Sequence, residues 1–333
     1  MTSNPTQQDN LTNNPVILWL LDSDPAIRWQ TLRDLTTAST DVINAERSKV
    51  GIEGMGAQLL NMQAKNGTWS NTAWNRGWDS TMHVLMLLRD MGLDPASEPA
   101  INALACVSEN VTWQGDDAYS GNPFFSGEVE PCINGQVGAV GAYFKQNVSI
   151  IINRLLTEQL PDGGWNCEAE NGSTRGSFNT TICALEALSE YEIAFGSRSD
   201  ITQARHRGEE YLLARRLYKR LSTGEVIYID RKDGTGNHEH PAFTQLAFPT
   251  WWHYDILRGL DYFRRTGQAP DDRLSDAINL LKSKRHADGT WHLDRRYEGR
   301  MPVELDEGVG KPNKWITLQA MRVLKWYEGA SSL

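Results

Sequence analysis

A short phrase occurs three times in this chain, and it constrains the fold more than any other feature. Residues 63–69 read QAKNGTW, residues 159–165 read QLPDGGW, and residues 285–291 read RHADGTW. Each phrase follows one helix-like segment and precedes another. A spacing so far above the helix and strand periods indicates one helical unit copied along the chain. Functional residues must therefore be sought where the copies differ.

The segments between the phrases are predicted to be helices. Apolar residues recur in them at three and four positions, while Gly and Pro fall in the connections. Six helical pairs are expected, and the long, variable loops favour a closed ring over an open solenoid. The first members of the pairs are residues 16–21, 57–63, 100–110, 149–159, 201–217 and 274–284, and the second members are 26–35, 84–88, 131–144, 183–191, 256–262 and 317–326.

Length and composition agree with a single helical domain. The chain has 333 residues, of which 40% are hydrophobic, so it can bury a large core. We expect a flexible tail over residues 1–14 and one toroid domain over residues 15–333. The one β-rich run, residues 225–229, falls in a long loop, so the fold class is predicted to be all-α.

Charge and hydropathy exclude several partners. The net charge of -9 argues against binding nucleic acid. No signal peptide is recognised, and no stretch approaches the roughly 18 apolar residues of a transmembrane helix. We therefore expect a cytoplasmic protein with reduced cysteines. Its protein partners, if any, are unknown from the sequence.

The full pattern Gln-x3-Gly-x-Trp, present at residues 63–69 and 159–165, resembles the QW repeat of squalene and oxidosqualene cyclases. It also resembles the related repeat of protein prenyltransferase β subunits, and the resemblance covers about residues 50–327. It implies an (α/α)6 toroid, with an inner ring of helices around an apolar central cavity and an outer ring around it. The implied ligand is an apolar small molecule such as an isoprenoid. Trp69, Trp165 and Trp291 are then structural residues that tie one helix to the next.

The acid of the cyclases has no full counterpart here. Those enzymes protonate their substrate with an Asp-x-Asp-Asp motif at the start of an inner helix, where a buried carboxylic acid can be a strong donor. The chain has no such motif. Asp116 and Asp117 lie in a Gly-rich loop, and Glu128 with Glu130 is a loose substitute.

The zinc site of the prenyltransferases has a partial counterpart. Those proteins hold zinc with Asp-x-Cys at one inner-helix start and His at the next. The resemblance places Glu130 and Cys132 at the first position and Asn179 at the position of the His. Asn is a poor zinc ligand, so either another residue completes the site or no zinc binds.

Cys167 and His253 are the residues that could complete it. Cys132 and Cys167 lie in polar surroundings, and with Glu130 or His253 they would make an acceptable zinc set with one open position. His253 could equally be a structural helix-start residue or an acid or base. Three further residues, His238, Glu239 and His240, are assigned to a solvated loop, and two more cysteines, Cys106 and Cys183, to the core.

The remaining candidates lie where inner helices are expected to begin. Carboxylates beside aromatic rings can have a raised pKa, and aromatic faces can stabilise a carbocation. Tryptophans can also simply fill a helical core. Asp79 and His83 lie on one face of their helix, four residues apart, and capping is the favoured role of Asp79. The residues assigned to catalysis are Glu130, Cys132, His253, Asp255 and Glu128, and those assigned to the cavity are Asp79, Asn179, Trp251, Trp252, Trp315 and Phe125.

Two functions remain open from the sequence. The first is an enzyme of the terpenoid cyclase and prenyltransferase type, with zinc as its one candidate cofactor. The second is a non-catalytic protein that binds a lipid, an isoprenoid or another protein on the same fold. A fold of this kind hosts more than one chemistry, so the site must decide.

Overall fold

The structure is a computed structural model that describes residues 14–115, 118–233 and 236–330. Its described helices form the expected pairs, with one addition, α4 (Thr40–Ser48), which packs on α3. The first helices of the pairs are α2 (Pro15–Leu21), α5 (Gly54–Asn61), α7 (Glu98–Asn110), α9 (Ser149–Thr157), α11 (Ser199–Ala214) and α13 (Ser275–Ser283). The second helices are α3 (Pro25–Leu35), α6 (Thr81–Asp90), α8 (Pro131–Tyr143), α10 (Phe178–Phe195), α12 (Ile256–Arg265) and α14 (Lys314–Ala330).

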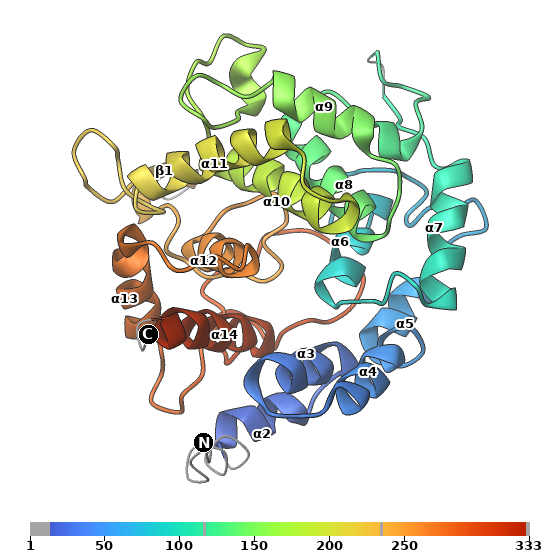
Figure 1. Cartoon of the computed structure of the whole chain (residues 1–333), viewed down its shortest axis with the longest axis horizontal. Helices are drawn as coiled ribbons and strands as arrows, with labels where there is room; N and C mark the ends of the chain where they lie inside the picture. The colour runs from blue at the N-terminus through green and yellow to red at the C-terminus, as the bar shows by residue number, and fades with distance from the viewer. Residues whose placement is uncertain (1–13, 116–117, 234–235, 331–333) are drawn as a thin grey trace.

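The second helix of each pair belongs to an inner ring. Figure 1 shows these helices around a common centre, with the first helices outside them. Neighbours such as α8 and α10, or α12 and α14, pack directly, and α14 closes the ring against α3. The fold is therefore all-α, an (α/α)6 toroid, as predicted. The lengths of the inner helices set its depth, and their starts and ends define its two faces.

The repeated phrases hold this ring together. The indole Nε1 of Trp69, Trp165 and Trp291 donates to the carbonyl of the residue ten positions earlier, at the end of the preceding outer helix. The backbone N–H of each Trp donates to a threonine hydroxyl in the first turns of the next inner helix. The glycine of each phrase has a φ between +80° and +87°, a conformation that favours glycine. These tryptophans are structural.

The first residue of each phrase makes side-chain hydrogen bonds, and in two copies these extend to the next outer helix. Gln63 Nε2 donates to the carbonyls of Gly67 and Ala103, and thereby joins its own loop to the next outer helix. Gln159 makes the matching bonds to Gly163 and Ala204. Arg285, in the third copy, keeps only the bond within its own loop. The third phrase thus keeps the hydrogen bond within its loop and lacks the hydrogen bond to another helix.

A β-hairpin interrupts the helices between α11 and α12. Strand β1 (Tyr228–Asp233) pairs antiparallel with β2 (Gly236–Pro241), and the β-rich run predicted from the sequence leads into it. Asp116 and Asp117, the side chains of His238, Glu239 and His240, and nearly all of the predicted tail 1–14 lie outside the described residues. Within the described part of the chain, every helix is too short or too polar to cross a membrane.

Candidate functional site

The start of α8 brings together three of the four predicted metal ligands. Glu130 is the N-cap residue of α8, Cys132 lies in its first turn, and Cys167 begins the short 3-10 helix η3 (Cys167–Ala169). One ligand atom from each, two sulfurs and one carboxylate oxygen, lies within 4.8 Å of the others. In the part of the chain that the structure describes, no other three acidic, Cys or His residues come together in this way. We call these residues the thiol cluster.

Local contacts fix the geometry of the thiol cluster. Glu128 Oε1 accepts the backbone N–H of Glu130 at 2.7 Å, and Pro131 occupies the first helical position, where its missing N–H costs nothing. Cys132 Sγ donates to Glu130 Oε2 at 3.4 Å. Cys167 Sγ lies 3.5 Å from Thr180 Oγ1, at the start of α10. The cluster is thus held between the starts of two neighbouring inner helices.

The two thiols differ in acidity. The hydrogen bond between them, together with burial, raises the pKa of Cys132. The same bond, helped by Thr180, lowers the pKa of Cys167. Cys132 is buried, Cys167 is half-buried and Glu130 is exposed, so the cluster is accessible from one side. Two thiols and a carboxylate suit zinc better than magnesium or calcium, and three protein ligands leave a position open.

The other predicted partners are engaged elsewhere. His253 is not a member of the thiol cluster and stacks between Trp252 and Tyr297, at ring-centroid distances of 3.7 and 3.6 Å. Asn179 Oδ1 accepts the backbone N–H of Tyr254 at 2.8 Å. The Asn that stands at the position of the prenyltransferase His therefore connects α10 to the loop before α12. Cys167 is the residue that adds a third ligand.

Aromatic rings fill the ring's centre at the starts of the inner helices. Trp78, just before α6, stacks on Trp251, just before α12, with ring centroids 5.1 Å apart. His83 lies edge-on to both and is fully buried. The indole of Trp78 donates to the carbonyls of Tyr297 and Glu298, in the loop before α14. Three connecting loops thus meet at this face of the ring.

The two predicted catalytic carboxylates nearby accept hydrogen bonds from the backbone. Asp255 is the N-cap residue of α12 and accepts the backbone N–H groups of Ala247 and Arg258 at 3.1 and 2.8 Å. Burial raises its pKa to about 6, although these hydrogen bonds oppose the shift. Glu128 is buried and supports the turn before α8. Each of the two carboxylates thus accepts at least one backbone N–H group at the start of an inner helix.

A cavity of about 210 Å³ occupies the ring nearer the ends of the inner helices. Its wall carries seven arginines and four carboxylates, so the central cavity is charged and not apolar as expected. Among the predicted cavity residues, Trp315 lines it; Asp79, Phe125, Asn179, Trp251 and Trp252 do not. The charged lining residues are Arg33, Arg47, Arg89, Arg258, Arg264, Arg265, Arg322, Asp90, Glu186, Glu190 and Asp261.

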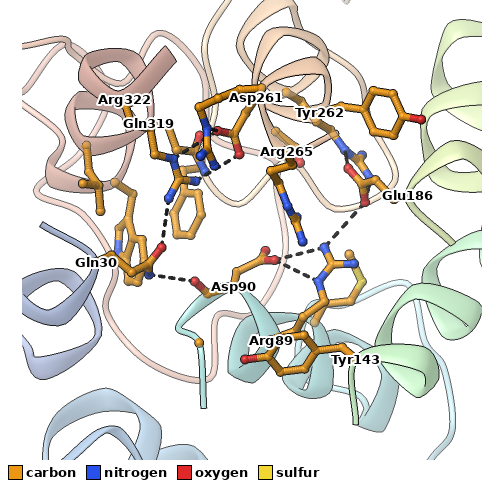
Figure 2. Close-up of a pocket in the computed structure, with 18 of the residues that line it drawn as sticks. Gln30, Arg89, Asp90, Tyr143, Glu186, Asp261, Tyr262, Arg265, Gln319 and Arg322 are labelled. Carbon is orange, nitrogen blue, oxygen red and sulfur yellow. Dashed lines mark hydrogen bonds and ion pairs between the residues drawn. The ribbon is translucent and has the colours of Figure 1, made fainter. Parts of the chain in front are cut away.

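Ion pairs organise the cavity wall (Figure 2). Glu186 on α10 binds Arg258 on α12 through two bonds of 2.7 and 3.0 Å, and Arg89 on α6 approaches it at 3.5 Å. Burial alone would raise the pKa of Glu186, but the two guanidinium charges hold it at about 2. Asp261 binds Arg322 on α14 through two bonds of 3.0 Å. The pairs join inner helices that are neighbours in the ring.

The cavity reaches solvent at the ends of the inner helices. Arg33 and Arg265, from the last turns of α3 and α12, have side chains that are 43% and 36% exposed. Phe248 and Trp315, at the other end of the cavity, stack on each other and are 5% and 2% exposed. Entry from the face that carries the helix starts is therefore blocked by aromatic side chains.

None of these charged residues was predicted from the sequence, because the central cavity was expected to be apolar. Arg258, Asp261 and Arg265 nevertheless recur on α12 at the three- and four-residue spacing of one helix face. Glu186 and Glu190 repeat at four residues on α10. A charged stripe on a helix predicted to lie in the inner ring was the signal.

Comparison with known proteins adds a distant likeness in fold. No protein-family model and no curated protein matches this chain. One solved structure that resembles it is a variant of the type II terpene cyclase MstE from Scytonema, in complex with its substrate geranylgeranyl dihydroxybenzoate. The likeness covers 98% of this chain and 99% of that one, with a TM-score of 0.44 and 16% sequence identity. At that level it transfers neither a site nor an activity.

Proposed function

We propose that this protein is a zinc-dependent enzyme of the terpenoid cyclase and prenyltransferase type. The observation that carries the proposal is the thiol cluster, in which Glu130, Cys132 and Cys167 converge at the start of an inner helix. These residues would hold the metal. When bound, zinc would activate a thiol or water, or polarise a substrate oxygen.

The chain's own residues prepare that site. Glu128 fixes the turn that presents Glu130, and Thr180 orients the Cys167 sulfur. Exposed Glu130 leaves one side of the cluster open to a substrate. Because ligand groups held in place before binding lose less freedom on binding, this support favours a resident metal.

The substrate class rests on the repeat resemblance alone. An apolar, isoprenoid-like small molecule is the expected substrate, but the charged central cavity offers no apolar tunnel for a long chain. A short substrate, or one that binds at the rim near the start of α8, agrees better with this wall.

A non-catalytic binding protein is the second candidate. What favours it is that the cavity carboxylates are paired with arginines, as Glu186 is with Arg258, so none of them is a free acid able to protonate an alkene. Such a protein would bind its ligand without metal and without turnover. Cyclisation of a squalene-like substrate by an acid in this cavity is disfavoured on the same ground.

Metal analysis combined with activity tests separates the two candidates. Purified protein is assayed for bound zinc, and isoprenoid diphosphates and squalene are tested for binding and turnover. The enzyme proposal expects stoichiometric zinc, lost in Cys132→Ser and Cys167→Ser, with turnover lost in parallel. Cys106→Ser is the matched control because Cys106 lies on the outer helix α7, outside the cluster. Metal-free wild-type protein that binds lipid without turnover would establish the binding protein instead.

A further inference from the structure

The charged cavity has more hydrogen-bond donors than acceptors. Each of its carboxylates is already engaged: Asp90 with Arg89, Glu186 with Arg258, Glu190 with Arg265, and Asp261 with Arg322 and Arg264. Asp34, just outside the lining, binds Arg33. The acceptors of the wall are thus saturated by its own arginines.

Positive charge is left over. Seven lining arginines face four lining carboxylates, and adding Asp34 still leaves a surplus of two positive charges. Arg47 shows this most clearly, since it donates to the Gly92 carbonyl and the Tyr143 hydroxyl and pairs with no carboxylate among the described residues. The surplus stands out in a chain of net charge -9.

Neutral donors line the same space. The Trp315 indole N–H is buried and has no hydrogen-bond partner in the described structure. The side chains of Ser189 and Gln319, which are half-buried and also line the cavity, make no hydrogen bond to another described residue. A buried donor without a partner is costly, so a ligand rich in acceptors would be stabilised here.

Several of the arginines also serve the helices. Arg33, Arg89, Arg264 and Arg265 lie in the last turns of their helices, where a positive side chain offsets the partial negative charge of the helix end. That effect is confined to the last turn. Arg47 also lies in a last turn, that of α4, but it extends into the cavity from outside the inner ring and lies over the Trp29 ring at 5.0 Å.

We propose that this cavity binds a small oxyanion with at least two negative charges, of the diphosphate or dicarboxylate kind. Guanidinium groups match both types of oxygen acid in shape and charge. The volume of about 210 Å³ holds several times the bulk of one water molecule, which suits a small polyanion. The ligand enters between the ends of the inner helices. This site is separate from the thiol cluster, so it does not rest on the zinc proposal.

Calorimetric titration of the full chain tests the proposal. The probes are inorganic diphosphate and succinate, compared with potassium chloride at matched ionic strength. Saturable one-to-one binding of either is expected, and the better of the two identifies a phosphate or a carboxylate ligand. Arg47→Met should weaken binding by about tenfold or more, since it removes a charge-assisted hydrogen bond. Arg216→Met, on the outer surface, should leave affinity unchanged.

Two further variants keep the test decisive. Gln319→Leu removes a donor that binds no other residue in the described ranges, so the variant should fold normally and still weaken binding. Cys132→Ser should lose zinc and keep the anion, which distinguishes failure of this proposal from failure of the zinc site. Heat changes no larger than those of potassium chloride, or equal affinity in wild type, Arg47→Met and Gln319→Leu, would overturn the proposal.

Discussion

The two faces of the inner ring differ in what occupies the centre of the ring. At the helix starts, the loops before α6, α12 and α14 fill the centre with stacked rings, among them Trp78 and Trp251. At the helix ends, the centre keeps a cavity lined by ion pairs such as Arg258 with Glu186. The closed face carries the thiol cluster at its edge, and the open face carries surplus positive charge in its middle. Position in the repeat therefore does not by itself locate the site; the side chains that fill the centre do.

The comparison also shows how the ring is stabilised. Apolar and aromatic packing at the closed face is tolerant of small shifts, whereas each buried charge at the open face requires its partner. The charged wall thus fixes the relative position of the inner helices. The cavity lies at the helix ends, where arginines paired with neighbouring carboxylates line the centre and no aromatic ring of the described residues fills it.

The largest expected effect comes from the residue that links the two faces. Arg258 binds Glu186 in the cavity wall and donates to the carbonyls of Trp251 and His253 at the closed face. Arg258→Met leaves the largely buried Glu186 without its closest partner, with Arg89 at 3.5 Å and the charge of Arg265 remaining, so the free energy of unfolding should fall by about 3–5 kcal/mol. Urea unfolding monitored by circular dichroism measures this.

Arg216→Met supplies the matched comparison. Arg216 pairs with Asp276 on the surface, with a side chain that is half exposed, so its loss should change the free energy of unfolding by less than about 1 kcal/mol. If both variants lost the same small amount of stability, the ion pairs of the wall would not hold the ring together.

A second prediction concerns pH at the closed face. Burial lowers the pKa of His83 to about 3, although Asp79 opposes the shift. The folded state therefore stays unprotonated while the unfolded chain binds a proton below about pH 6.5. The stability that His83 confers is complete above pH 6.5 and is lost as pH falls toward 3. Between pH 7 and 5 the loss amounts to about 2 kcal/mol.

His83→Gln tests this directly. The Gln side chain can keep a hydrogen bond to Ser80, which lies 2.7 Å from His83 Nδ1, but does not titrate. The decrease in unfolding free energy from pH 7 to pH 5 should be smaller in the variant by about 2 kcal/mol. An unchanged decrease would mean that water reaches His83 and that the closed face is open.

The smallest expected effect on stability is that of Arg47→Met, at the open face. Arg47→Met removes a charge that pairs with no described carboxylate, so stability without ligand should change by less than about 1 kcal/mol. Thermal unfolding of the ligand-free protein provides the measurement. A loss as large as that of Arg258→Met would make Arg47 a structural residue.

The sequence determined the fold well for a physical reason. Each phrase contains the residues that make the hydrogen bonds around it. Trp165, for example, binds the helix before it and the helix after it, and Gly163 supplies the turn. The spacing of apolar residues then predicted the residue ranges of the outer and inner helices. The added helix α4 was missed because it is polar on average and none of its residues is buried.

The candidate site could be predicted from the sequence only in part. Glu130 and Cys132 share one helix start, so their proximity follows from spacing, and the polar surroundings of Cys167 pointed to its loop. The contacts of His253 and Asn179 could not be foreseen, since they depend on how loops far apart in sequence stack. The charged stripes on α10 and α12 were visible in the sequence, but the pairing of Arg258 with Glu186, 72 residues apart on neighbouring inner helices, was not.

Zinc content of the purified protein and its cysteine variants tests the central claim most directly. Wild type and Cys106→Ser should each retain about one zinc per chain after dialysis, while Cys132→Ser and Cys167→Ser should retain almost none. Cobalt in place of zinc should show thiolate-to-metal absorption in the first two proteins alone. Wild-type protein that holds no metal, or zinc that persists in both Cys132→Ser and Cys167→Ser, would contradict the assignment of the thiol cluster.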